Sequence, residues 1–154
     1  AEQHLVGRYT LIARTAEALR SNTPFNFGGV ACPDTGIQAP IIKSAGVLFG
    51  NSVRIPKRSA LMLTEMAHSV HNAIRVPRGS AKQIVQLCFQ ADMSDPDHTG
   101  GADLIVVEEV TIPLELEAAV FTRASPTVEI RLFLHMHRFV RYREGGIVSR
   151  FVRL

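Results

Sequence analysis

The sequence predicts an α+β protein: a mostly antiparallel β-sheet or barrel with one central helix and an extended N-terminal arm. In the second half of the chain, apolar and polar residues alternate with the two-residue period of a strand, most clearly over 127–142. The best helical spacing of apolar residues lies at 59–74. Residues 21–46 are rich in Pro and Gly and show little periodicity. With 154 residues, 46% of them hydrophobic, the chain can build one core.

This pattern divides the chain into an N-terminal segment and apolar arm over 1–46 and an α+β core domain over 47–154. Residues 5–20 fit either a helix or a strand over 6–13 followed by one helical turn, and both interpretations stay open. Regular structure is not expected over 21–46, because Pro removes backbone donors and Gly permits positive φ. The Phe and Ile side chains of the arm need burial, so we expect the arm to lie over its own domain or on a neighbouring subunit.

Residues 47–55 predict a short strand or hairpin, which is broken at Gly50-Asn51 and ended by Pro56. The predicted helix begins at Ser59, whose hydroxyl can accept a hydrogen bond from the first free amides. Its apolar stripe, which extends the helix to residue 74, consists of Leu63, Met66, Ala67, Val70 and Ile74.

The remaining elements are predicted as strands, at 83–90, 104–112, 114–122, 127–142 and 147–154. A strand over 127–142 would be about 50 Å long at ~3.3 Å per residue, so it must bend or extend past the edge of the domain. Gly145-Gly146 predicts the turn of a final hairpin.

Charge is segregated along the chain. Residues 43–82 hold seven basic groups and one acidic group, 83–122 hold eight acidic groups and no Lys or Arg, and 123–154 hold seven basic and two acidic groups. Two interpretations stay open. The acidic strands pair with the basic hairpin inside one monomer, or acidic and basic faces meet between subunits.

The C-terminal hairpin is a candidate site for an anion. Its candidate residues are Arg131, Arg138, Arg141, Arg143, Arg150 and Arg153. Arg suits bidentate capture of carboxylate or phosphate. A two-residue turn at Gly145-Gly146 places Arg141 opposite Arg150 and Arg138 opposite Arg153, and such pairs need an anion. A four-residue turn over 143–146 would remove them. The anion is a carboxylate of this chain, a carboxylate of another copy, or a nucleic-acid backbone.

His135 and His137 are a weak candidate for a metal site. Two positions apart on a strand, their imidazoles lie on one side and about 6.6 Å apart along it, which allows both to ligate a metal. The pair is similar to the HxH pair of cupin barrels, but the Gly before it and the Glu after it are absent at the cupin spacing. Two polar residues on a half-exposed strand face are the more common interpretation, so no cofactor is expected.

Two further clusters are weak candidates for metal sites. Asp95, Asp97 and Asp103 follow part of the EF-hand spacing, but the twelfth position holds Val in place of the required Glu, so cation binding would be weak. Glu65, His68 and His71 recur every third residue on the predicted helix. Their spacing spreads them towards solvent, and the second such helix of a di-iron bundle is missing.

Several classes are disfavoured. Cys32 and Cys88 are far apart and outside any CxxC pattern, which favours buried, reduced thiols over a disulfide or zinc site. No signal peptide or membrane-length apolar stretch is expected, so the prediction is a cytoplasmic protein or one within an intracellularly assembled particle. The GxSxG, GxGxxG and GxxxxGK[ST] patterns do not occur.

The favoured function is a non-catalytic, self-assembling structural subunit of a ring, tube or shell, such as a virion or compartment subunit. Its partners would be copies of itself, with nucleic acid or another polyanion as a further candidate and no membrane. The element order resembles the hot-dog fold of thioesterases and dehydratases. That resemblance rests on element order alone and transfers no catalytic residue. The alternative function is a small oligomeric enzyme of hot-dog or barrel type that uses His135, His137 or Glu65 in acid–base or metal chemistry. A monomeric anion-binding module is the third hypothesis.

Overall fold

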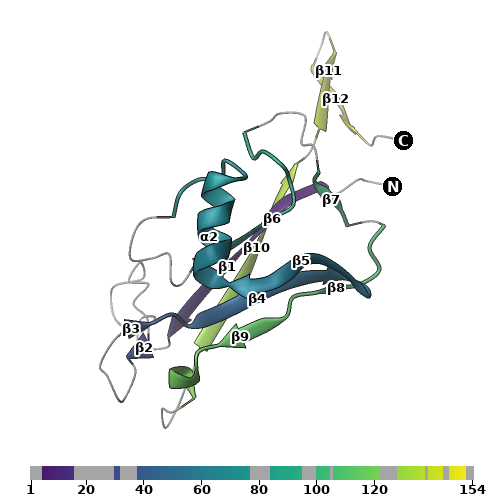
Figure 1. The fold of residues 1–154 in the computed structure, drawn as a ribbon. Helices are drawn as coiled ribbons and strands as arrows, with labels where there is room; N and C mark the ends of the chain where they lie inside the picture. The colour runs from purple at the N-terminus through teal and green to yellow at the C-terminus, as the bar shows by residue number, and fades with distance from the viewer. Residues whose placement is uncertain are drawn as a thin grey trace.

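The computed structural model describes residues 5–15, 30–31, 38–76, 84–94, 100–104, 106–121, 128–137, 139–143 and 146–151. Over these residues the chain is mostly antiparallel β, with two main sheets and one short α-helix (Figure 1). The predicted α+β class with β dominance is therefore confirmed.

The first sheet is built around β1 (Leu5–Thr15), which lies between β10 (Val128–His137) and β6 (Ile84–Cys88). Both neighbours are antiparallel to β1, and β7 (Ala102–Asp103) pairs with its first residues. The pattern at 5–20, which left helix and strand open, therefore folds as a strand. A central strand buries one full face, and the alternating Tyr9, Leu11 and Ala13 are buried.

The second sheet has the order β5–β4–β8, where β4 is Ile42–Phe49, β5 is Ser52–Ser59 and β8 is Val110–Thr111. The predicted hairpin at 47–55 is confirmed and is longer than expected. Its turn includes Gly50, whose φ of 54° lies in the left-handed region. Pro56 does not end β5, contrary to the prediction, because β5 is an edge strand, where the missing N–H is tolerated.

The acidic segment forms shorter strands than predicted. Residues 106–109 are not strand, and β9 (Leu114–Leu116) is followed by a 3₁₀ turn, η1 (Ala118–Val120). β8 pairs with Leu48 and Phe49 at the very end of β4, so a longer β8 would have no partner strand there.

The helix α2 (Ala60–Ser69) packs against β6 and is shorter than predicted. Its predicted cap is confirmed, since Ser59 Oγ accepts a hydrogen bond from the Met62 N–H at 3.3 Å. Asn72, with a φ of 49°, stands in the left-handed conformation just beyond the helix end. Val70 and Ile74, predicted on the buried stripe, therefore lie outside the helix and are 58% and 77% exposed.

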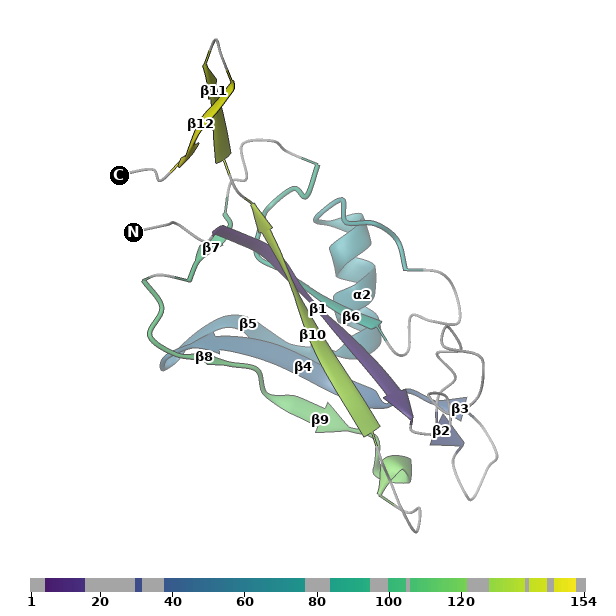
Figure 2. The ribbon, with the colours of Figure 1, turned by 180° about the vertical axis from the view of Figure 1, so that it is seen from behind.

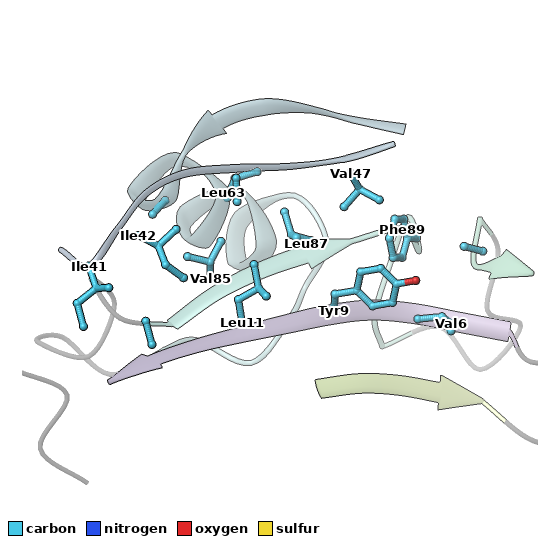
Figure 3. Close-up of a cluster of buried hydrophobic side chains, with 14 of the residues drawn as sticks. Val6, Tyr9, Leu11, Ile41, Ile42, Val47, Leu63, Val85, Leu87 and Phe89 are labelled. Carbon is cyan, nitrogen blue, oxygen red and sulfur yellow. The ribbon is translucent and has the colours of Figure 1, made fainter. Parts of the chain in front are cut away.

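The core lies between the two sheets. Figure 3 shows the side chains of β1 and β6 pointing towards those of β4, with Leu63 of α2 beside them. The rings of Tyr9 and Phe89 meet edge to face, with centroids 4.9 Å apart. Ile41, Ile42 and Val47 are fully buried, so the core does not divide at residue 46.

Part of the predicted 1–46 segment thus belongs to the core: β1 occupies the middle of the first sheet, and Ile41 and Ile42 of the arm are buried. Within the arm, β2 (Val30–Ala31) and β3 (Gln38–Ala39) form an antiparallel pair. Residues 16–29 and 32–37 lie outside the described residues, so the expected position of the arm stays a prediction.

The long predicted strand at 127–142 is divided into two. β10 belongs to the first sheet, while β11 (Phe139–Arg143) pairs with β12 (Gly146–Phe151) in a two-stranded sheet of its own. Figures 1 and 2 show this hairpin extending beyond the end of the first sheet. The expectation that the strand runs past the edge of the domain is confirmed.

Candidate functional site

The most unusual surface of the molecule is the outer edge of β10. β10 pairs with β1 along one side, and no described strand pairs with its other side over Val128–His137. In Figure 2, β10 crosses the near side of the molecule, with α2 behind it. The backbone N–H and C=O groups of such an edge can pair with another strand. We call Val128–His137 the β10 edge.

The β10 edge exposes apolar side chains on both faces of the strand, although Phe133 is alone among Glu129, Arg131 and His135 on one of them. Val128 and Ile130 pack against the core. Further along are large apolar residues that are 42–45% exposed: Leu132, Phe133, Leu134 and Met136. Because successive strand residues point to opposite faces, these side chains expose apolar surface on both sides of the sheet. Large exposed apolar patches mark interaction surfaces more often than free surface.

Two of the other described sheet edges, at β6 and β5, are protected. At the β6 edge, α2 packs on the strand, and its Thr64 Oγ1 donates a hydrogen bond to the Ile84 carbonyl at 3.1 Å. β5 carries a proline and three cations, Arg54, Lys57 and Arg58, which are typical devices against edge-to-edge pairing. β10 has neither device in its apolar half, so it is the edge open to pairing.

The polar side chains of the β10 edge are held by the same molecule. Arg131 forms an ion pair with Glu129, two positions earlier on the strand. His135 Nε2 lies 3.1 Å from Thr10 Oγ1, and its Nδ1 lies 3.4 Å from Arg8 Nη2. A guanidinium only donates, so Nδ1 accepts from Arg8 and Nε2 donates to the threonine. These contacts fix the His135 ring against β1.

The predicted metal sites are not assembled among the described residues. No group of three or more His, Cys, Asp or Glu side chains there converges on a point. The side chain of His137 and the residues Asp95 and Asp97 lie outside the described part of the chain. Asp103 is half-buried on β7, where it pairs with Leu5.

The helical Glu65, His68 and His71 cluster has a structural role. His68 Nδ1 lies 3.2 Å from the Ala73 carbonyl oxygen, and His71 Nδ1 lies 2.8 Å from that of Gln90. Both imidazoles thus tie the end of α2 to neighbouring backbone, while Glu65 is exposed.

The register of the arginine hairpin differs from the expected one. Arg141 lies opposite Ser149, and Arg150 lies opposite Val140. Of the two turns left open by the sequence, the register at the end of the hairpin fits the four-residue turn over 143–146, since Tyr142 pairs with Ile147 and Arg143 with Gly146. Arg141 therefore does not face Arg150. Arg138 and Arg153, and the side chains of the other hairpin arginines, lie outside what the structure describes, so the anion site stays a prediction.

One acidic residue is neutralised within the chain by lysines. Lys57 Nζ lies 2.8 Å and Lys43 Nζ 3.0 Å from the carboxylate of Glu115, and Ser44 Oγ donates to it at 2.9 Å. These hydrogen bonds, that of Lys57 first, lower the pKa of Glu115 to about 2. Here the acidic segment pairs inside one molecule, but with lysines of the second sheet in place of hairpin arginines.

Asp92 is also held within the chain. Its carboxylate accepts hydrogen bonds from the side chain and backbone N–H of Ser94 and from the amide of Asn72. The Ser94 bonds are the main cause of the lowered pKa of Asp92. By contrast, Glu108 and Glu109 are exposed, and neither forms an ion pair with any described residue.

None of the helical segments that the structure describes reaches the length and hydropathy of a membrane span. A scan against protein-family models and a search of curated proteins give no match to this chain.

Proposed function

We propose that the chain is a non-catalytic structural subunit that assembles with copies of itself, and that two copies join along the β10 edge. The observation that carries this proposal is the unprotected edge of β10, with its exposed apolar residues on both faces. Adding a strand to such an edge satisfies backbone groups and buries side chains at the same time. The β6 and β5 edges lack this combination.

The sequence of β10 is complementary to itself in the antiparallel direction. If the two-fold axis passes through Leu132, Glu129 lies opposite His135 of the partner subunit. Ile130 lies opposite Leu134 of the partner subunit, which keeps apolar residues on one face. No like charges are opposed in this register, and direct opposition of like charges would destabilise the ladder. A second copy is therefore the partner that the edge fits best.

A ring, tube or shell needs a second contact beyond a two-fold dimer. The hairpin β11–β12 extends past the sheet and carries Arg141, Arg143 and Arg150. Glu108 and Glu109 are exposed and form no ion pair with described residues. We assign the second contact to these two groups, hairpin arginines of one copy and acidic residues of the next. Arg is well suited to bidentate binding of carboxylate.

The test of the β10 edge is the mass in solution of the wild type and of Leu132→Lys. The wild type is expected to form a species well above the 16.9 kDa monomer at micromolar concentration. Leu132→Lys places two like charges opposite each other at the two-fold axis, so association should weaken at least tenfold. Sedimentation or light scattering across a dilution series gives the dissociation constants.

The matched control is Leu61→Lys, since Leu61 is a 61%-exposed leucine on α2, away from the edge. It should associate like the wild type. A wild type that stays monomeric at micromolar concentration, or equal weakening by both variants, would contradict the proposal. If the wild type forms a dimer and nothing larger, the ring, tube or shell is ruled out, while the proposed β10 contact is retained.

A further inference from the structure

A cleft lies on the opposite side of the first sheet from the β10 edge, where β5, α2 and β6 meet. It has a volume of about 300 Å³, at the lower end of the range of small-molecule pockets. Its inner wall is apolar and buried, with Leu63 and Ala67 of α2 and Phe89 after β6 at 1–6% exposure. The assembly proposed above does not use this cleft.

One of the residues that line the cleft has a buried polar atom without a hydrogen-bond partner. Gln86 of β6, which lines the cleft, is 7% exposed, and its Oε1 has no hydrogen-bond partner among the described residues. Its Nε2 donates to the Ile74 carbonyl at 3.4 Å. If the amide oxygen and nitrogen of Gln86 were exchanged, the amide oxygen would lie next to the Ile74 carbonyl oxygen, and both atoms are acceptors. The nitrogen therefore faces Ile74, and Oε1 is the unpaired atom. Buried acceptors are seldom left unpaired, and this one requires a donor.

The rim of the cleft is cationic. Arg54 and Arg58 of β5 both line the cleft, and both are exposed. Arg54 uses one N–H on the Gly100 carbonyl, and Arg58 uses one on Met62 Sδ. Each guanidinium has five N–H donors. No described carboxylate forms an ion pair with either arginine.

The other polar groups of the cleft add no charge that would oppose an anion. Burial raises the pKa of Cys88 to about 11, so its thiol stays neutral near pH 7. His71 is occupied by the Gln90 carbonyl. The cleft therefore changes from cationic at its rim to apolar, with one unpaired acceptor on its buried wall.

We propose that this cleft binds a small carboxylic acid that carries a hydroxyl group at the end opposite its carboxylate. The carboxylate binds Arg54 and Arg58 at the rim. The methylene groups pack against Leu63 and Phe89. The terminal hydroxyl donates its hydrogen bond to Gln86 Oε1.

The experiment compares three ligands of equal chain length on the full chain: ω-hydroxyhexanoate, hexanoate and hexanol. Amide chemical shifts or calorimetry give each dissociation constant. Hexanoate lacks the donor for Gln86, and hexanol lacks the carboxylate for the arginines. Each should bind roughly tenfold more weakly than ω-hydroxyhexanoate, the ratio expected for one well-placed hydrogen bond. Equal affinities for all three, or no binding of ω-hydroxyhexanoate, would overturn the proposal.

Variants then assign each half of the ligand. Gln86→Met removes the acceptor at similar length, so ω-hydroxyhexanoate should bind no better than hexanoate. The Arg54→Gln, Arg58→Gln double variant should bind ω-hydroxyhexanoate no more tightly than the wild type binds hexanol. The control, Lys43→Gln with Arg75→Gln, removes the same charge outside the cleft and should keep the wild-type preferences. A Gln86→Met protein that retains the preference would overturn the assignment. Should that variant not fold, the three-ligand comparison on the wild type decides.

Discussion

At the scale of single residues, the carboxylate of Glu115 has the clearest electrostatic environment among the described residues. Three donors, from Lys57, Lys43 and Ser44, converge on its two oxygens. The lysines belong to β4 and β5 and Glu115 to β9, so the cluster joins three of the four strands of the second sheet. The sequence shows that residues 43–82 are basic and residues 83–122 acidic. Which lysine pairs with which carboxylate depends on the register of the strands.

Glu115→Gln should lower stability near neutral pH and have little effect in strong acid. The folded-state pKa is depressed from the ordinary value of 4.5 to about 2, so the carboxylate stabilises the fold above pH 4.5. That contribution is lost as the pH falls from about 4.5 to about 2. Urea unfolding of both proteins at several pH values measures the difference.

The control for this experiment is Glu109→Gln, since the only hydrogen bond of the Glu109 side chain to a described residue comes from Thr111 at 3.4 Å. It should show no such pH window. A constant difference between wild type and Glu115→Gln from pH 7 to pH 2 would contradict the assignment of the ion pairs to folded-state stability.

At the scale of elements, the close approach of β5 to β4 depends on one glycine of β4. Gly46 lies at a register irregularity between Ala45 and Val47. Its N–H donates to the Pro113 carbonyl. A Cβ atom there would lie 2.9 Å from the Ile55 carbonyl oxygen and 3.0 Å from Lys57 Cα. Both are backbone atoms and cannot rotate away, so only glycine allows β5 this close to β4.

Gly46→Ala should therefore destabilise the protein by about 1–3 kcal/mol, the usual cost of overpacking. Gly50→Ala is the comparison, since a Cβ atom at Gly50 would meet no other atom within 4 Å and only the φ of +54° is unfavourable. That variant should lose about 1–2 kcal/mol. Urea denaturation midpoints measure both, and wild-type stability of Gly46→Ala would contradict the close approach.

Local chemistry predicts some elements and not others. The Ser59 cap and the turn at Gly50 depend on neighbouring residues only, and the sequence predicts both correctly. The prediction that Pro56 ends its strand is wrong, because nothing in its neighbours indicates that β5 is an edge. The predicted helix extends too far, to Ile74, because the apolar spacing continues past Asn72 although the backbone turns there.

At the scale of the whole molecule, the proposed assembly is expected to be sensitive to salt, because charge is segregated along the chain. If hairpin arginines meet the exposed Glu108 and Glu109 of the next copy, screening weakens that contact. The Debye length falls from about 10 Å at 0.1 M salt to about 3 Å at 1 M. The mass of the assembly should fall towards that of the β10-joined dimer over this range, as sedimentation would show.

Glu108→Gln with Glu109→Gln should lower the mass in the same way at low salt. Glu65→Gln with Glu115→Gln removes equal charge elsewhere and should not. Assemblies that persist unchanged from low to high salt would contradict the charged contact and leave the β10 edge in place. The Arg141→Ala, Arg150→Ala double variant tests the other role of the hairpin. If it binds single-stranded nucleic acid more weakly than the wild type while the mass of the assembly is unchanged, the hairpin binds phosphate.

The candidate surface is only partly visible in the sequence. Phe133 interrupts the alternation of the 127–142 pattern, and this is the signal that β10 exposes apolar side chains on both faces. That β10 is an edge strand follows from its pairing with β1, which no local pattern encodes. The buried acceptor of Gln86 gives no signal, because its isolation depends on what α2 and β6 bring around it.

The central position of β1 has a consequence for synthesis of the protein. Thr10 and His135, joined by a hydrogen bond, are 125 positions apart. A ribosome releases Thr10 125 residues before His135, so β1 receives its second neighbour only when β10 has been translated. Until then the nascent polypeptide exposes one side of β1, and contacts of such long range are slow to form. The first sheet therefore stays incomplete while the residues between β1 and β10 are translated.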